Sequence, residues 1–188
     1  MKKLLLIFLS AIIFSCTTEV KEELNAVNNE AAFNKNVQTF MDFTKAFGEE
    51  DIDGVMNLFA DSALWSPPEY NSYEWLSKDE LKVALTNYMN AFDNLKFTPG
   101  INLPGGNLVD GFWGGSRYRS DGNENTSSLS SSNPNNIRVY GTWSSTHTES
   151  GKETFSKWYA IVNFNDSGKI VRFNDWFNVD GLQVQINQ

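Results

Sequence analysis

Residues 137–177 read IRVYGTWSSTHTESGKETFSKWYAIVNFNDSGKIVRFNDWF and contain two nearly identical tight turns, ESGK at 149–152 and DSGK at 166–169. In each turn a Ser-Gly pair lies between charged residues, and glycine supplies the positive φ angle that a two-residue hairpin loop needs. The segments around the turns are rich in β-branched and aromatic residues. The pattern predicts three long antiparallel strands that follow one another as a meander.

Two-residue loops would also fix which residues face each other across the strands. If Glu149 pairs with Lys152, and Asp166 with Lys169, one face of the meander is apolar except at one position. The expected sets on this face are Val139 with Val162 and Phe173, Gly141 with Ala160 and Asp175, Trp143 with Trp158 and Phe177, and His147 with Thr154. The opposite face is polar with embedded aromatic residues, namely Tyr140, Tyr159 and Trp176.

Asp175 is the charged residue on the apolar face, and its expected neighbours, Gly141 and Ala160, are too small to cover it. A carboxylate above such a gap suggests a pocket. Burial raises the pKa of a carboxyl group, which suits a general acid or base. A bulge that reverses the face, or hydrogen bonds from a helix or loop, would explain the residue equally well, so both interpretations stay open.

The first residues carry the pattern of a secretory signal: two lysines are followed by an apolar run, 4–14, that is too short to span a bilayer comfortably. The run ends in Ile13-Phe14-Ser15-Cys16, which resembles the lipobox of bacterial lipoproteins, where cleavage leaves a lipidated cysteine at the N-terminus. An ordinary secreted protein with a spare thiol is the alternative.

The expected organisation is a signal peptide over 1–15, a flexible polar tether over 16–29 and a single domain over 30–188. The resemblance to lipoproteins implies lipidation of Cys16 and a place in the bacterial cell envelope. Thr17 after the cysteine looks like an outer-membrane context, and the side of that membrane stays open. The membrane is then reached through the lipid anchor only.

Composition excludes several classes of function. Removal of residues 1–15 takes away Lys2 and Lys3 and moves the formal charge from −8 to −10, so nucleic acid is a poor partner. One histidine and one cysteine leave no His/Cys metal cluster, and no phosphate-binding Gly-rich loop is present. We expect neither a metal nor a cofactor.

Helical patterns precede the meander. Apolar residues recur at helical spacing over 33–47, Asp51 can cap a short second helix, and Ser77 with Glu80 forms the capping box of a third. The third helix should bury Leu81, Leu85, Tyr88, Phe92 and Leu95. Its Tyr88 hydroxyl needs a partner, which could be Asp175. Residues 104–136, rich in Gly, Ser and Asn, form an insertion that is either a functional lid or partly disordered.

This order of elements is similar to that of the nuclear transport factor two-like superfamily, and most of all to its SnoaL-like branch. The resemblance rests on the element order from about Phe33 to Gln185, on residues 52–65, and on Gly181-Leu182 followed by Gln185. It implies an α+β fold in which a cone-shaped, curved antiparallel sheet wraps around N-terminal helices and encloses a conical pocket. Members include polyketide cyclases, ketosteroid isomerases, dehydratases and epoxide hydrolases, and also binding domains without chemistry.

The resemblance would place Asp175 on the pocket wall, with an apolar lining of Trp65, Trp143, Trp158, Phe177 and Phe92 beside Tyr88. Asn178 stands where many relatives carry an acidic residue, so the role of that residue is not carried over.

Two hypotheses follow. The first is a pocket that binds a small apolar or aromatic molecule, or an assembly domain, in a homodimer formed through the sheet face. The second is a cofactor-free isomerase, cyclase or dehydratase with Asp175 as base and Tyr88 or His147 as hydrogen-bond donor. We favour the first because the sequence offers one candidate carboxylate and no partner fixed by spacing.

Overall fold

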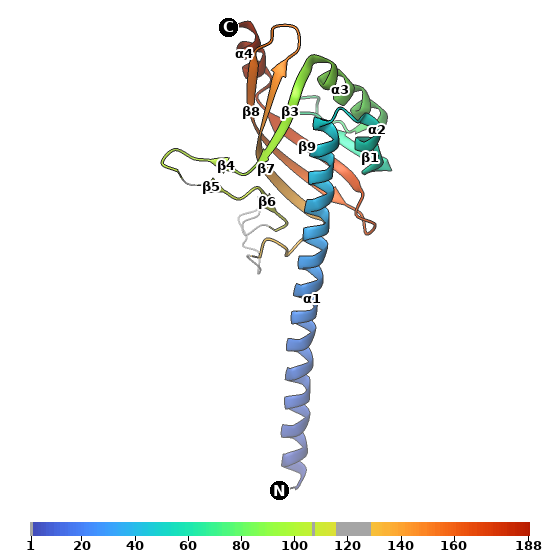
Figure 1. Cartoon of the computed structure of the whole chain (residues 1–188). Helices are drawn as coiled ribbons and strands as arrows, with labels where there is room; N and C mark the ends of the chain where they lie inside the picture. Colours follow the sequence, from blue (N-terminus) through green and yellow to red (C-terminus); the bar gives the residue numbers. More distant parts are fainter. Residues whose placement is uncertain (1, 107, 116–128) are drawn as a thin grey trace.

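The protein is α+β, with a long N-terminal helix, three shorter helices and a curved seven-stranded sheet (Figure 1). This computed structural model describes residues 2–106, 108–115 and 129–188. The helices are α1 (Lys2–Gly48), α2 (Ile52–Asn57), α3 (Lys78–Ala91) and α4 (Val179–Asn187). The strands are β1 (Phe59–Ser66), β2 (Leu76–Ser77), β3 (Phe92–Pro99), β4 (Ile101–Asn102), β5 (Leu108–Val109), β6 (Phe112–Trp113), β7 (Asn136–His147), β8 (Glu153–Phe164) and β9 (Ile170–Phe177).

The meander of β7, β8 and β9 is the centre of the sheet, as predicted. The strand order is β2-β1-β9-β8-β7-β3, and β6 also pairs with β7. All these pairs are antiparallel except β1 with β9, which is parallel, so the sheet is mixed. The α+β class and the curved sheet that covers the N-terminal helix are confirmed. The short strands β4 and β5 pair with each other outside this sheet.

The predicted register is right for the second hairpin and wrong for the first. Ala160 faces Asp175, as expected. Gly141, however, faces Trp158, and Val139 takes the expected place of Gly141 opposite Ala160. The reason is the loop: His147 bonds with Lys152, so the turn spans 148–151 instead of two residues, with Gly151 at φ 68°. A shift of two keeps every side chain on its predicted face.

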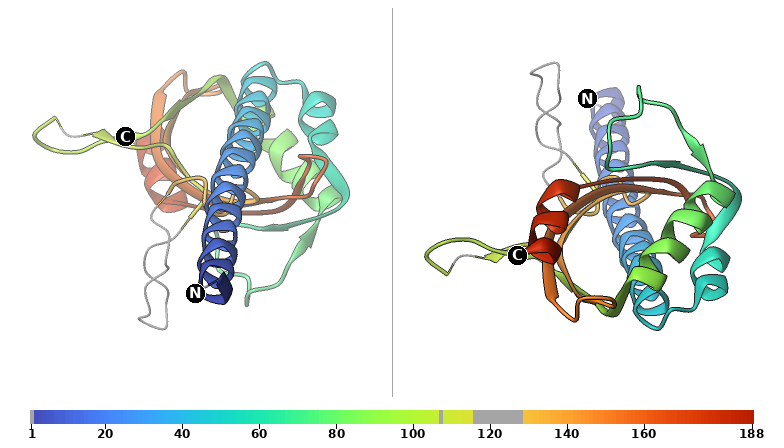
Figure 2. Two further views of the ribbon diagram at one scale, coloured as in Figure 1. Left: turned by 90° about the horizontal axis from the view of Figure 1, so that it is seen from below. Right: turned by 90° about the horizontal axis from the view of Figure 1, so that it is seen from above.

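The hydrophobic core lies between the concave face of the sheet and the C-terminal half of α1, together with α3 (Figure 2). Three phenylalanines of α1, Phe40, Phe43 and Phe47, are buried. Phe40 stacks on Trp158 of β8 with ring centroids 5.8 Å apart, and Phe43 lies 5.5 Å from Phe173 of β9. The aromatic residues of the meander are therefore held against α1 on the face that the alternation predicted.

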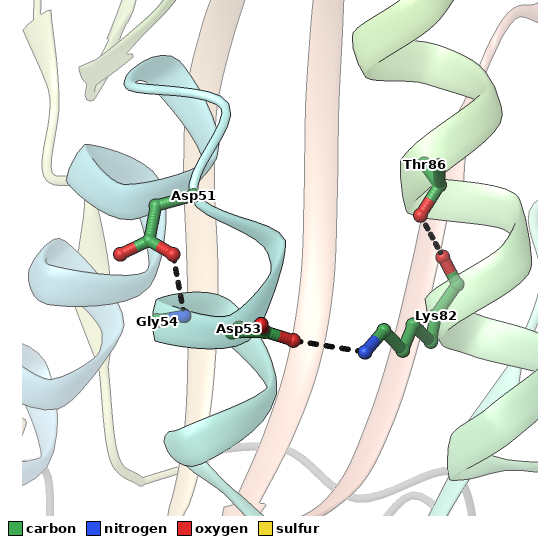
Figure 3. A network of polar contacts seen from close by, with 5 residues as sticks. All are labelled: Asp51, Asp53, Gly54, Lys82 and Thr86. Atoms are coloured by element: carbon green, nitrogen blue, oxygen red, sulfur yellow. Dashed lines mark hydrogen bonds and ion pairs between the residues drawn. The ribbon is translucent and has the colours of Figure 1, made fainter.

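Helix caps fix α2 and α3 beside this core. Asp51 caps α2 by accepting a hydrogen bond from the Gly54 amide at 2.8 Å, and Lys82 of α3 forms an ion pair with Asp53 of α2 at 2.9 Å (Figure 3). The predicted capping box at the start of α3 is present, with Ser77 and Glu80 bonded in both directions. The caps hold α3 in the position that places its apolar side over the sheet.

The insertion at 104–136 contributes two short strands, β5 and β6. Phe112 of β6 pairs with Val139, and its ring lies 5.9 Å from that of Phe40, so this part of the insertion belongs to the core. Residues 107 and 116–128 lie outside the described part of the chain.

The N-terminal helix α1 extends far beyond the body of the domain (Figure 1). It is helical through 16–29, where the sequence predicts a tether, and the division into signal, tether and domain stays a prediction. Within the described ranges, no helix combines the length and the apolar character needed to cross a bilayer. The side chain of Cys16, the predicted lipidation site, lies outside what the structure describes.

Candidate functional site

A cavity of about 100 Å³ lies between α1, α3 and the strands of the meander. Its wall is mostly aromatic and aliphatic, with one carboxylate and a few hydroxyl groups. The lining residues are Phe43, Phe47, Leu85, Tyr88, Phe92, Leu95, Trp143, Ser145, Thr154, Ser156, Trp158, Phe173, Asp175, Phe177 and Leu182. The composition is that of a small-molecule site, in which an apolar wall carries a few placed polar groups.

Asp175 is the carboxylate of this cavity, and two tryptophans hold it in place. Trp65 of β1 donates its indole N–H to Oδ1 at 3.0 Å, and Trp158 of β8 donates to Oδ2 at 3.2 Å. The side chain is buried, with 7% of its surface exposed. Burial raises the pKa of Asp175 to about 6, although both indole bonds act in the opposite direction. The group therefore changes charge close to neutral pH.

The charges near Asp175 are negative. Glu69, exposed in the segment after β1, raises the pKa of Asp175 and also that of Tyr88. Among the described residues, the ion pairs are Lys45–Glu49, Lys78–Asp61 and Lys82–Asp53, and none includes Asp175. Asp175 is thus a buried acid without a positive partner in this part of the chain, which is unusual because buried charges are normally paired.

Tyr88 of α3 lines the same cavity. Its ring packs against Phe177 at 6.2 Å, and burial together with the negative charges of Glu69 and Asp175 raises its pKa to about 12. The hydroxyl is therefore protonated at neutral pH. Among the described residues it has no hydrogen-bond partner, so the expected bond to Asp175 is absent and the two indoles take that place.

The structure brings together most of the predicted site residues. Tyr88, Phe92, Trp143, Trp158, Asp175 and Phe177 line the cavity. Trp65 is not in the lining and acts by holding Asp175. His147 is also outside the lining: its Nδ1 lies 2.9 Å from the Ser150 hydroxyl in the loop, and its ring packs on Phe92 at 5.5 Å. His147 thus lies at the end of β7, next to the hairpin loop, and is not among the residues that line the cavity.

Sequence reasoning missed several residues of the wall. Phe47 was expected only on the apolar stripe of the first helix, Phe43 and Ser145 were not predicted, and the wall was assigned neither Thr154, expected on the apolar face of the meander, nor Ser156. Alternation along β8 offered a signal for the last two, because Thr154 and Ser156 share a face with Trp158. Within the described ranges, no group of three or more His, Cys, Asp or Glu side chains could hold a metal ion.

No protein-family model matches this sequence, and no curated protein matches it. Solved structures do match. One is a provisionally assigned isomerase from Bacillus subtilis, with a TM-score of 0.60 and 15% identity over 83% of this chain and 95% of that one. Another is a Catenulispora acidiphila protein with a ketosteroid isomerase-like fold, in complex with trimethylamine, with a TM-score of 0.53 and 7% identity over 79% and 92%.

A third match is an NTF2-like protein of unknown function from Burkholderia pseudomallei, with a TM-score of 0.51 and 19% identity over 82% of this chain and 98% of that one. At these identities the likeness concerns the fold. The alignments cover 79% to 83% of this chain, so the structural similarity extends over the body of the domain. The chain therefore has the α+β fold of the nuclear transport factor two-like (NTF2-like) superfamily.

Proposed function

We propose that this protein binds a small apolar or aromatic molecule in the cavity between α1, α3 and the meander. The observation that carries the proposal is the composition of the wall, with many aromatic rings around one oriented carboxylate. A fully packed core would leave no such space, since protein interiors are close-packed and voids larger than a water molecule are few. The Catenulispora structure of similar fold, which is a complex with trimethylamine, supports a small ligand.

The test is to fill the cavity. Ser156 lines it, and its side chain makes no hydrogen bond with any residue that the structure describes, so Ser156→Leu adds bulk without breaking a polar contact there. Ligand-observed NMR with a library of small molecules should detect binders of the full-length chain that Ser156→Leu no longer binds. Ser62→Leu is the matched control, because Ser62 is exposed on β1. Binders that both variants retain, or no binders at all, would contradict the proposal.

We propose further that the domain is anchored at the cell envelope through Cys16. The support is the pattern of the first sixteen residues, in which the only cysteine follows the apolar run after one serine. In cells, Cys16→Ser should move the protein from the membrane fraction to the soluble fraction, while Thr18→Ser should leave it with the membranes. Membrane association that is independent of Cys16 would contradict the anchor.

A second candidate function is cofactor-free acid/base chemistry, an isomerisation, cyclisation or dehydration. It is favoured by the presence of two polar groups in one cavity: Asp175, which titrates near neutral pH, and Tyr88, whose hydroxyl is protonated and unbonded. Turnover of an isomerase or dehydratase substrate that is lost in both Asp175→Asn and Tyr88→Phe would support this function. Binding without turnover in such panels would favour the first function.

We also propose a homodimer through the convex face of the sheet. Tyr140, Tyr159 and Trp176 form an aromatic row across β7, β8 and β9, with centroid distances of 4.9 Å and 5.1 Å. Trp176 keeps 41% of its surface exposed. A row of this kind on a free surface favours association with a second copy.

A further inference from the structure

We propose that the ligand of the cavity is a small organic ammonium ion, whose positive charge faces Asp175 and whose alkyl groups contact the aromatic wall. This inference rests on the proposed binding function and adds the chemical class of the ligand. Three independent features of the described residues lead to it: a carboxylate without a positive partner, a cage of aromatic rings, and a negative local field.

The first feature is the charge that Asp175 lacks. Both oxygens of Asp175 accept an indole N–H, at 3.0 Å and 3.2 Å. This arrangement suits the ionised carboxylate, because a protonated carboxyl group would have an O–H that needs an acceptor. Neutral donors alone compensate a buried charge incompletely, and in the described part of the chain no lysine, arginine or histidine forms an ion pair with Asp175. A cationic ligand would supply the missing countercharge.

The second feature is the ring cage. Phe47, Tyr88, Phe92, Trp143, Trp158 and Phe177 line the cavity together with Asp175. Trp143 stands at 90° to Trp158 and at 82° to Phe47, so these rings of the wall pack edge to face. Faces of tryptophan and tyrosine attract cations, and quaternary ammonium groups are recognised in such aromatic cages. An apolar ligand would use the same rings but would leave the carboxylate unpaired.

The third feature is the sign of the field. Glu69 raises the pKa of both Asp175 and Tyr88, which is the effect of a nearby negative charge. The whole chain carries a formal charge of −8. The remaining polar groups of the wall are hydroxyls, and Ser145 and Thr154 already bond to each other at 2.8 Å. An anion would thus meet the Asp175 carboxylate, with Glu69 adding to the repulsion, and no cation among the described lining residues, whereas an ammonium ion would be attracted.

The size of the cavity restricts the ligand further. At about 100 Å³ it is somewhat smaller than the engineered apolar cavity of ~150 Å³ that holds benzene. Ligands of that scale include ammonium groups with methyl or ethyl substituents. A longer amine would need to extend from the cavity, with its ammonium head group inside.

The test compares two molecules of nearly the same shape, tetramethylammonium and tert-butanol, with the purified full-length chain at pH 8 and constant ionic strength. Calorimetry, or NMR titration of the tryptophan indole signals, should show that tetramethylammonium binds at least about tenfold more tightly. Asp175→Asn should remove about tenfold of the tetramethylammonium affinity and leave that for tert-butanol within about twofold. Asp166→Asn, the same change in the exposed loop between β8 and β9, should alter neither.

The outcomes separate this inference from the binding function on which it rests. Equal or tighter binding of tert-butanol to the wild-type chain would overturn the ammonium proposal and keep the pocket as an apolar site. Absence of binding by either molecule, and by the wider library, would overturn both. The comparison of the two molecules on the wild-type chain needs no variant, so it tests the ammonium proposal even if Asp175→Asn folds poorly.

Discussion

At Asp175, burial and hydrogen bonding act on one carboxyl group in opposite directions. Burial favours the neutral acid, while the indoles of Trp65 and Trp158 favour the carboxylate, and burial is the stronger effect. Glu69 adds to the effect of burial, and Tyr88, with a pKa of about 12, stays neutral in the same range. With a pKa of about 6, the Asp175 carboxyl group is mostly ionised at pH 7 and takes up a proton just below neutral pH.

This pKa predicts how stability depends on pH. A carboxyl group whose pKa is about 6 in the folded chain and near 3.8 in the unfolded chain binds its proton more tightly when folded. Its contribution to the free energy of unfolding should fall as pH rises from about 4 to 6, by about 3 kcal/mol in total. Urea unfolding at pH 4.5 and pH 7 should show about 2 kcal/mol of this loss in the wild type and none of it in Asp175→Asn. Parallel curves for the two proteins would contradict a raised pKa.

The two indoles allow a sharper test at the same residue. Trp65→Phe removes the donor to Oδ1 and keeps an aromatic ring outside the cavity lining, so the pKa of Asp175 should rise by about one further pH unit. Trp143→Phe is the matched control, because Trp143 lines the cavity without a bond to Asp175. Carboxyl-carbon NMR titration measures both. An equal effect of the two substitutions would show that general packing, and not the hydrogen bond, sets the pKa.

At the scale of the strands, the alternation of residues predicted which face is buried, and turn chemistry predicted only part of the register. The predicted β8–β9 pairs are present over Trp158 to Asn163, although Asn165, and not Asp166, bonds with Lys169; the local irregularity between Asn163 and Phe164 restores the predicted register. In the β7–β8 loop the same Ser-Gly signal is compatible with a longer turn. The hydrogen bonds of His147 select that turn, and they depend on the folded strands.

The hairpin loop offers a prediction of its own. Gly151 has a φ angle of 68°, and a Cβ atom there would meet no atom within 4 Å, so Gly151→Ala strains only the backbone. We expect a loss of about 1 kcal/mol in the free energy of unfolding. Glu149→Ala, in the same loop, should change it by less than about 0.5 kcal/mol. Unchanged stability of Gly151→Ala would show that the loop differs from the structure.

The support of Asp175 could not be predicted from local patterns. Trp65 and Asp175 are 110 positions apart, and they meet because β1 pairs in parallel with β9. Sequence periodicity could place Asp175 on a buried face and Tyr88 on a buried helix stripe, but it could not decide which donor reaches the carboxylate.

At the scale of the whole molecule, the two faces of the sheet carry different features. The concave face of the sheet holds the core and the cavity, while the convex face carries the row of Tyr140, Tyr159 and Trp176. This separation means that association through the convex face and binding in the cavity can be altered independently. It also leaves the long helix α1 outside both surfaces over its N-terminal part (Figure 1).

The independence of the surfaces gives a prediction for the assembly. Trp176→Glu places a charge in the aromatic row of the proposed dimer interface and should weaken dimerisation at least tenfold, as measured by analytical ultracentrifugation of the full-length chain. Val83→Glu, at a residue of α3 that is 62% exposed, introduces the same charge elsewhere and should leave dimerisation unchanged. A wild-type chain that sediments as a monomer at high concentration would contradict the dimer.

The pair of indoles on Asp175 also makes the site visible. Indole emission responds to charge beside the ring nitrogen, and two of the six tryptophans in the chain bond to this one carboxylate. Each change in the proton or the ligand at Asp175 should therefore alter the colour and intensity of the protein's own fluorescence. The molecule carries an optical reporter of its cavity, which can be read without any label in the purified chain.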